Sequence, residues 1–199
     1  MRITSGIARG ISLDSPRGDT TRPATDSARQ AIFSSLGESV VDACVLDLFA
    51  GTGSYGLESA SRGAKEVFFV ENDRRAFDCL KRNVATVSKA LHTEAPQVRL
   101  NTISADFFRA SKNLIDKNFD IIFADPPYRL LLEKKSLGDI LEAFTMLAKD
   151  TTLFVLEAPA EFEMPIETSD AKFTFDVIKR LGKKSKGKPS QIIFKILKK

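Results

Sequence analysis

Histidine and cysteine are scarce in this chain of 199 residues, and their scarcity excludes several kinds of catalytic site. The only histidine, His92, lies in a polar stretch before Pro96, and no serine, cysteine or second histidine is arranged with it for nucleophilic or metal chemistry. The two cysteines, Cys44 and Cys79, show neither a Cys-x-x-Cys spacing nor a metal-ligand pattern. We therefore expect reduced thiols in the core and no metal ion.

The chain also lacks a long apolar run. No apolar stretch approaches the roughly 20 residues that cross a bilayer, and residues 1–6 lack the apolar core of a signal peptide. We therefore expect a cytoplasmic protein with no membrane partner. The composition, 43% hydrophobic and 28% charged, fits one globular domain over residues 1–199, with residues 1–23 as an arm or hairpin and residues 24–199 as the core domain.

Positive charge is concentrated at the two ends of the chain, whose net charge is +4. Residues 1–29 hold five arginines against three aspartates, residues 179–199 hold nine basic residues and no acid, and the segment between them is acidic. A basic margin on an acidic body favours a polyanionic partner. A solvated tail that only aids solubility explains the same charge.

Hydrophobic patterning predicts an α/β fold with a seven-stranded, mostly parallel sheet. The expected parallel strands are Val45–Phe49, Val67–Glu71, Val98–Ser104, Phe119–Ala124 and Thr152–Glu157. The expected helices are Gly56–Arg62, Asp73–Lys89, Phe107–Ile115 and Leu131–Ala148, with another that begins just after Pro23. After Pro165, Phe173–Arg180 and Gln191–Leu197 are expected to form an antiparallel hairpin at the sheet edge, joined by the lysine-rich loop Gly182–Pro189.

A glycine-rich turn links the first expected strand to a helix. Gly51, Gly53 and Gly56 satisfy the spacing G-x-G-x-x-G, and Glu71 ends the next strand about 20 residues later, where dinucleotide folds place the acid that binds a ribose. A nicotinamide-dependent dehydrogenase must therefore be considered. Asp47 argues against it, because its carboxylate would repel a pyrophosphate but would attract an ammonium or sulfonium group.

Residues 47–53, Asp-Leu-Phe-Ala-Gly-Thr-Gly, resemble the first motif of Rossmann-like methyltransferases, which bind S-adenosylmethionine. The resemblance implies that Glu71 accepts from both ribose hydroxyls, that Asp106 hydrogen-bonds the adenine amino group and that Phe107 packs on the ring. The other expected cofactor-binding residues are Asp47, Phe49, Gly51, Gly53 and Asn72. Alternatively, Glu71 and Asp106 are ordinary strand-end acids or helix caps.

The tetrapeptide Asp125, Pro126, Pro127 and Tyr128 follows a buried strand and is the most specific signal in the sequence. Two prolines fix the backbone and remove two N–H donors, which leaves carbonyl oxygens and one carboxylate as rigid acceptors. Such acceptors suit an exocyclic base amine, and Tyr128 would stack on a flipped base. The alternative is a proline-rich turn with its aromatic ring in the core.

Four segments together resemble the RsmD family of 16S ribosomal RNA guanine-N2 methyltransferases: residues 1–10, 21–33, 47–53 and 125–128. The resemblance spans nearly the whole chain and implies a class I methyltransferase fold acting on 16S ribosomal RNA or the assembling small ribosomal subunit. It also implies that Arg22, Pro23, Thr25, Asp26 and Arg29 border the cleft. One departure is Ala8, which stands where the family usually has an aromatic residue. The expected RNA-binding residues are Arg9, Arg22, Arg29, Lys183, Lys184, Lys186 and Lys188.

Two other functions use the same fold. A DNA adenine-N6 methyltransferase could use the same tetrapeptide, although no segment is spare for a target-recognition insert. A catalytically silent RNA-binding assembly factor is the second, and the intact Asp125 and Glu71 argue against it.

Overall fold

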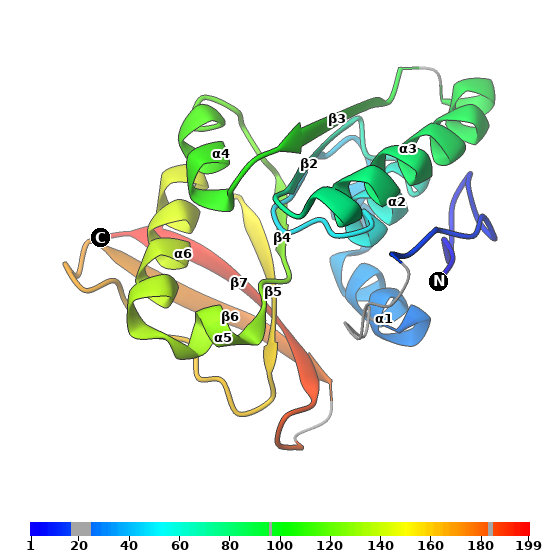
Figure 1. Ribbon diagram of the computed structural model, residues 1–199. Coiled ribbons are helices and arrows are strands. Elements are labelled where there is room, and N and C mark those ends of the chain that lie inside the picture. Colours follow the sequence, from blue (N-terminus) through cyan, green and yellow to red (C-terminus); the bar gives the residue numbers. More distant parts are fainter. Residues whose placement is uncertain (17–24, 96, 183–184) are drawn as a thin grey trace.

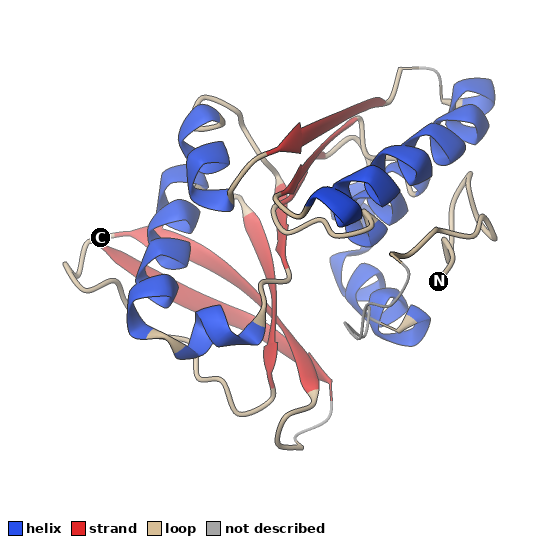
Figure 2. Cartoon of the chain, in the orientation of Figure 1, coloured by secondary structure: helices blue, strands red, loops and turns tan. Residues whose placement is uncertain are grey.

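In the computed structural model, described for residues 1–16, 25–95, 97–182 and 185–199, seven strands form one sheet in the order β3-β2-β1-β4-β5-β7-β6 (Figures 1 and 2). The strands are β1 Cys44–Asp47, β2 Glu66–Glu71, β3 Arg99–Ser104, β4 Ile121–Ala124, β5 Leu153–Pro159, β6 Phe173–Gly182 and β7 Pro189–Lys198. The first five are parallel, whereas β7 is antiparallel to both β5 and β6. The predicted fold class is therefore confirmed, including the antiparallel hairpin at the edge.

Helices cover both faces of the sheet (Figure 1). They are α1 Asp26–Leu36, the 3-10 helix η1 Gly37–Val40, α2 Ser54–Ser61, α3 Arg74–Glu94, α4 Phe107–Asn113, α5 Tyr128–Leu132 and α6 Lys134–Leu147. Helices α1, α2 and α3 bury their apolar residues with Val45, Phe69, Phe123 and Val155 in one core. Helices α4, α5 and α6 pack on the opposite face with Leu46, Phe68, Ile122 and Leu156. Burial on both faces explains why β4 and the first three residues of β1 are apolar without alternation.

One predicted helix was wrong. The pattern over Leu131–Ala148 predicts a single helix, but the structure has two, α5 and α6, separated at Glu133. Glu133 has an extended backbone, with φ −85° and ψ 117°, which interrupts the helical hydrogen bonds. Four consecutive polar residues, 133–136, interrupt the apolar spacing between Leu132 and Leu137, and this interruption is the signal in the sequence that the prediction did not use.

Other boundaries shift without changing an element's type. Helix α2 begins before Gly56, because Gly53 takes a left-handed conformation and serves as its N-cap. Helix α3 extends beyond Lys89 to Glu94, and the predicted cap Asp73 accepts a hydrogen bond from Ala76 N at 2.9 Å. Both cysteines are buried and free, as expected.

The first residues form a small hairpin that packs on the end of α2. Arg2 pairs with Ser12 in an antiparallel bridge, and Ile3 N donates to the Ile11 carbonyl at 2.9 Å. Gly6 has φ +80°, and a Cβ there would lie 1.7 Å from the Ser61 carbonyl oxygen, so only glycine allows this approach. The predicted amino-terminal hairpin is therefore present within residues 1–16.

Candidate active site

Acidic side chains stand at the carboxyl ends of four parallel strands. Asp47 ends β1, Glu71 ends β2, Asp125 follows β4, and Glu157 lies near the end of β5. Each stands two residues beyond a residue of the core under α1, α2 and α3: Val45, Phe69, Phe123 or Val155. Because side chains alternate along a strand, all four acids fall on that same face. They flank the β1–β4 junction, where the strand order reverses and where open α/β sheets bind ligands.

The glycine loop between β1 and α2 is tied to both neighbouring strands. Leu48 N donates to the Phe123 carbonyl of β4, and Ala50 N donates to the Val70 carbonyl of β2, each at 2.9 Å. Gly51 has φ +54°, and a Cβ there would meet nothing within 4 Å. The loop is therefore rigidly held, with open space beside Gly51 into which a ligand can fit against the backbone.

Asp47 is a buried carboxylate with one oxygen unused. Its Oδ2 accepts from Gly56 N at 3.0 Å, whereas Oδ1 receives no hydrogen bond from the described residues. Burial, reinforced by the negative charge of Glu71, raises the pKa of Asp47 to about 7. A buried acceptor without a donor fits a ligand that brings an ammonium group to the end of β1.

Glu71 holds the loops on either side of it. Its Oε2 accepts from Gly51 N, and its Oε1 accepts from Asp73 N, both at 2.7 Å. A carboxylate has about four acceptor positions, so two remain for the hydroxyls of a ribose. Asn72, the next residue, is exposed beside it.

The remaining predicted cofactor residues come from α4 and the glycine loop. Asp106 caps α4, because its Oδ1 accepts from Phe108 N at 2.9 Å and from Arg109 N at 3.4 Å. The helix-cap interpretation therefore holds for one of its oxygens. The half-buried rings of Phe49 and Phe107 pack together with centroids 5.0 Å apart. They offer an apolar surface next to the polar end of β3.

The tetrapeptide presents a carboxylate that the described residues leave without a hydrogen bond. No hydrogen bond from the described part of the chain reaches the Asp125 carboxylate, and burial and the nearby charges of Glu157 and Asp47 raise its pKa. Pro126 is buried, and Pro127 is exposed and precedes α5, which begins at Tyr128. Burial, and then the charge of Glu157, raises the pKa of the half-buried Tyr128, so its hydroxyl stays protonated.

Sequence reasoning missed Glu157. It is 6% exposed, and its Oε2 accepts hydrogen bonds from Tyr55 Oη and from Gln191 Nε2, each at 3.1 Å. Burial raises the pKa of Glu157, while these two hydrogen bonds oppose the rise. The signal that could have found it is one charged residue within the apolar run of β5, at the carboxyl end where the other acids stand.

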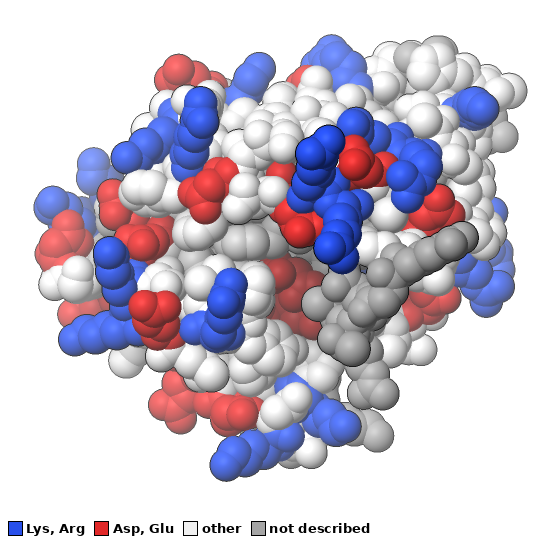
Figure 3. All heavy atoms as spheres, in the orientation of Figure 1, with Lys and Arg blue, Asp and Glu red and all other residues white. Residues whose placement is uncertain are grey.

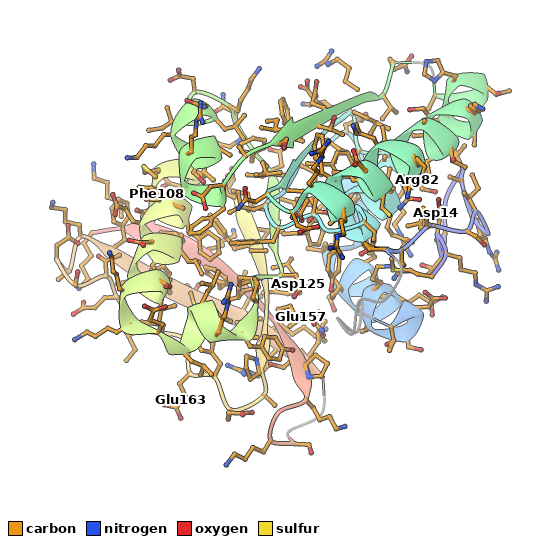
Figure 4. The ribbon with its side chains drawn as sticks, viewed as in Figure 1. Asp14, Arg82, Phe108, Asp125, Glu157 and Glu163 are labelled. Carbon is orange, nitrogen blue, oxygen red and sulfur yellow. The ribbon has the colours of Figure 1, made fainter. Side chains whose placement is uncertain are left out.

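Figure 4 places Asp125 and Glu157 next to each other at the centre of the molecule. In the same orientation, Figure 3 shows acidic atoms set into the middle of this face. Lysine and arginine side chains surround this acidic centre and are interspersed with further acidic side chains, so basic groups flank the site on this face.

The predicted RNA-binding residues differ in their exposure, and some lie outside the described residues. Arg9 is exposed on the amino-terminal hairpin, and Lys186 and Lys188 are exposed in the loop before β7. Lys188 also accepts from Ala160 N through its carbonyl, at 2.9 Å, which holds that loop at the carboxyl end of β5. Arg22, Lys183 and Lys184, like Pro23, lie outside the described residues.

The prediction that Arg29 contacts RNA was wrong. Its side chain is fully buried, donates to the Arg2 carbonyl and to Asp26 Oδ1, and lies 3.9 Å from the Glu58 carboxylate of α2. A side chain without exposed surface cannot neutralise a phosphate. Thr25, likewise, caps α1 by accepting from Ala28 N at 3.2 Å. Arg29, Asp26 and Thr25 therefore fix α1 and the hairpin against α2.

The described residues lack both a membrane span and a metal cluster. They contain no helix long and apolar enough to cross a membrane. They also contain no group of three or more histidine, cysteine, aspartate or glutamate side chains that could hold a metal ion.

Comparisons with known proteins agree with this geometry. A family model described as Conserved hypothetical protein 95 matches residues 1–185. Ribosomal RNA small subunit methyltransferase D of Escherichia coli K12 is 34% identical over 165 residues, covering 83% of this chain and 78% of the relative. The protein of that name from Haemophilus influenzae is 33% identical over 142 residues, 71% of each chain.

A solved structure shares the fold over nearly the whole chain. A hypothetical protein of Thermus thermophilus superposes with a TM-score of 0.74 at 26% sequence identity, over 98% of this chain and 99% of that one. The family model and the relatives favour a methyltransferase over the dehydrogenase that the glycine spacing allowed. The chain therefore belongs to the Conserved hypothetical protein 95 family, the RsmD family of methyltransferases.

Proposed function

We propose that this chain is a single methyltransferase domain, residues 1–199, that uses S-adenosylmethionine to methylate the exocyclic N2 amine of a guanine in 16S ribosomal RNA. One observation carries the proposal: the Asp125 carboxylate receives no protein donor in the described chain, and it lies beside the glycine loop at the strand-order reversal. The names of the relatives support ribosomal RNA as the substrate, because these relatives are ribosomal RNA small subunit methyltransferases. Action on ribosomal RNA in turn supports a cytoplasmic location.

The cofactor fits the first half of the site, the side formed by the ends of β1 and β2. When bound, S-adenosylmethionine supplies an electrophilic methyl group on a positively charged sulfur. The unused Asp47 Oδ1 would accept from its ammonium group, and Glu71 would accept from its ribose hydroxyls. Asp106 would take the adenine amino group, while Phe49 and Phe107 would contact the ring. Gly51 and Asn72 would line the approach, since Gly51 leaves its neighbourhood open, and Gly53, which packs closely against Leu80, would hold the loop in place.

The second half of the site, formed by the ends of β4 and β5, would hold the base. The lone pair of an exocyclic amine is delocalised into the ring, so acceptance of its two N–H groups by Asp125 and the Pro126 carbonyl would help to localise that pair on nitrogen. Pro127 keeps the turn rigid, and Tyr128 would stack on the base. Because burial raises the pKa of Asp125, it is also a suitable acceptor for the proton that the amine releases.

RNA would reach this site across the basic margin. Arg9 and the exposed Lys186 and Lys188 would contact phosphates, together with Arg22, Lys183 and Lys184. Such contacts position an RNA but do not select its base. We therefore assign base selection to the groups around Asp125.

Methyl transfer to ribosomal RNA tests the proposal. Purified protein is incubated with labelled S-adenosylmethionine and either naked 16S RNA or small subunits from a strain that lacks the gene, and the RNA is digested to nucleosides. Label in N2-methylguanosine is expected. Label found only in N6-methyladenosine of added DNA would favour the DNA adenine enzyme, and RNA binding without any transfer would favour an assembly factor.

A further inference from the structure

We infer that Glu157 accepts the ring N1–H of the target base and thereby selects guanine over bases that lack this hydrogen. The inference rests on the proposed function, because it assigns a role in base recognition within the same site.

Sheet pairing brings Glu157 to the level of Asp125. In the parallel pair β4 and β5, Ala124 stands opposite Leu156, so the next residues, Asp125 and Glu157, follow at the same level. Side-chain alternation directs both to the face under α1, α2 and α3. Figure 4 shows the two labelled side chains side by side, whereas Glu163 lies farther along the loop that follows β5.

One oxygen of Glu157 is fixed and the other is available. Tyr55 Oη and Gln191 Nε2 both donate to Oε2, while Oε1 receives no hydrogen bond from the described residues. Tyr55 is itself held by stacking on Phe123, with ring centroids 5.1 Å apart and planes at 9°. Gln191 stands opposite Glu157 in the β5–β7 pair. These contacts hold a nearly buried carboxylate in one orientation, with Oε1 unbonded.

The edge of guanine matches this set of acceptors. Guanine presents N1–H next to the two N–H groups of N2, so Glu157 and the acceptors around Asp125 would be filled together. Adenine and 2-aminopurine instead present an unprotonated ring nitrogen at N1. Its lone pair would face the carboxylate, which would leave a buried acceptor without a donor.

The experiment compares guanine with 2-aminopurine, which keeps the 2-amino group but lacks N1–H. Single-turnover methylation is measured on RNA fragments that carry either base at the target position, with wild-type protein, Glu157→Gln and Glu163→Gln. The wild type is expected to prefer guanine by at least about tenfold, the loss caused by one unpaired buried charged acceptor. Glu157→Gln should lower this preference at least about fivefold, because an amide can also donate to N1.

Glu163→Gln is the matched control, because it makes the same chemical change on an exposed residue of the neighbouring loop and should keep the wild-type preference. Glu157→Gln retains an oxygen that can accept from Tyr55 and Gln191, so folding should persist, and its thermal unfolding is measured alongside. Should it fail to fold, Tyr55→Phe removes one fixing hydrogen bond and should lower the preference about threefold.

Two results would overturn the inference. One is a wild-type protein that methylates both bases equally. The other is a folded Glu157→Gln variant that slows both reactions by the same factor, which indicates a structural role. Absence of guanine methylation by the wild type would instead refute the proposed function itself.

Discussion

The two halves of the site hold their carboxylates in different ways. On the β1–β2 side, Asp47 and Glu71 accept from backbone N–H groups of Gly56, Gly51 and Asp73. On the β4–β5 side, Asp125 receives no donor from the described chain, and Glu157 is held by two side chains. The first half is therefore organised by local loops, whereas the second depends on long-range contacts and leaves acceptors for a substrate.

Substitution of Asp47 is expected to have the largest effect, and that effect is on stability. On the β1–β2 side the carboxylates accept from backbone N–H groups, but Asp47 Oδ1 receives no hydrogen bond from the described residues. Burial raises the pKa of Asp47 from 3.8 to about 7. The stability that the protonated Asp47 carboxyl contributes to the folded protein is therefore fully present below about pH 4 and is lost as pH rises through about 7. Asp47→Asn avoids this loss. Without cofactor it should be more stable than the wild type above pH 7, by up to about 4 kcal/mol.

Denaturant unfolding of both proteins between pH 5 and pH 8 measures this difference. The gap should widen as pH rises and then level off above pH 7, while the variant binds S-adenosylmethionine more weakly than the wild type. A gap that stays constant over this range would show that Asp47 does not titrate there.

Asp125→Ala tests whether the second half acts on the base more than on the cofactor. Turnover should fall at least about a hundredfold, as on removing one preorganised electrostatic contact, while affinity for S-adenosylmethionine changes much less. Single-turnover kinetics and calorimetry measure the two quantities. Retained turnover would remove Asp125 from the reaction.

Glu71→Ala tests the opposite half. Affinity for S-adenosylmethionine should weaken by about 1.5 to 3 kcal/mol, the range for hydrogen bonds to a charged group. Part of this loss would come from the Gly51 loop, because Glu71 Oε2 also holds Gly51 N. Unchanged affinity in calorimetry would exclude Glu71 from the cofactor site.

The smallest effect is expected outside both halves, at the basic margin. Replacement of Lys183, Lys184, Lys186 and Lys188 by glutamine should weaken RNA binding and flatten the slope of log affinity against log salt by about 0.7 to 0.9 for each phosphate that the loop no longer neutralises. The methylated guanine and the affinity for S-adenosylmethionine should stay the same. Binding to a 16S RNA fragment at several salt concentrations is the measurement, and an unaltered slope would mean that this loop is only a solvated edge.

The fold and the first half of the site could be predicted because their signals are local. Each strand carries its own apolar run, and residues 47–53 contain the turn, the glycines and the buried acid within seven consecutive positions. The break at Glu133 was not predicted, because the sequence marks it only by four polar residues, 133–136, between the apolar residues of α5 and α6.

The sequence by itself determined the succession of strands and helices along the chain, the glycine loop and the rigid turn at Asp125. These features depend on neighbouring residues and backbone chemistry. Tertiary structure alone decided that Arg29 is buried against Glu58 and that Glu157 faces Asp125. Tyr55 and Glu157 are 102 positions apart and meet only because the Tyr55 side chain, at the start of α2, stacks on Phe123 of β4 and reaches Glu157 of β5. A pattern within one segment cannot specify such a contact, since it depends on which strands become neighbours and which face each side chain occupies.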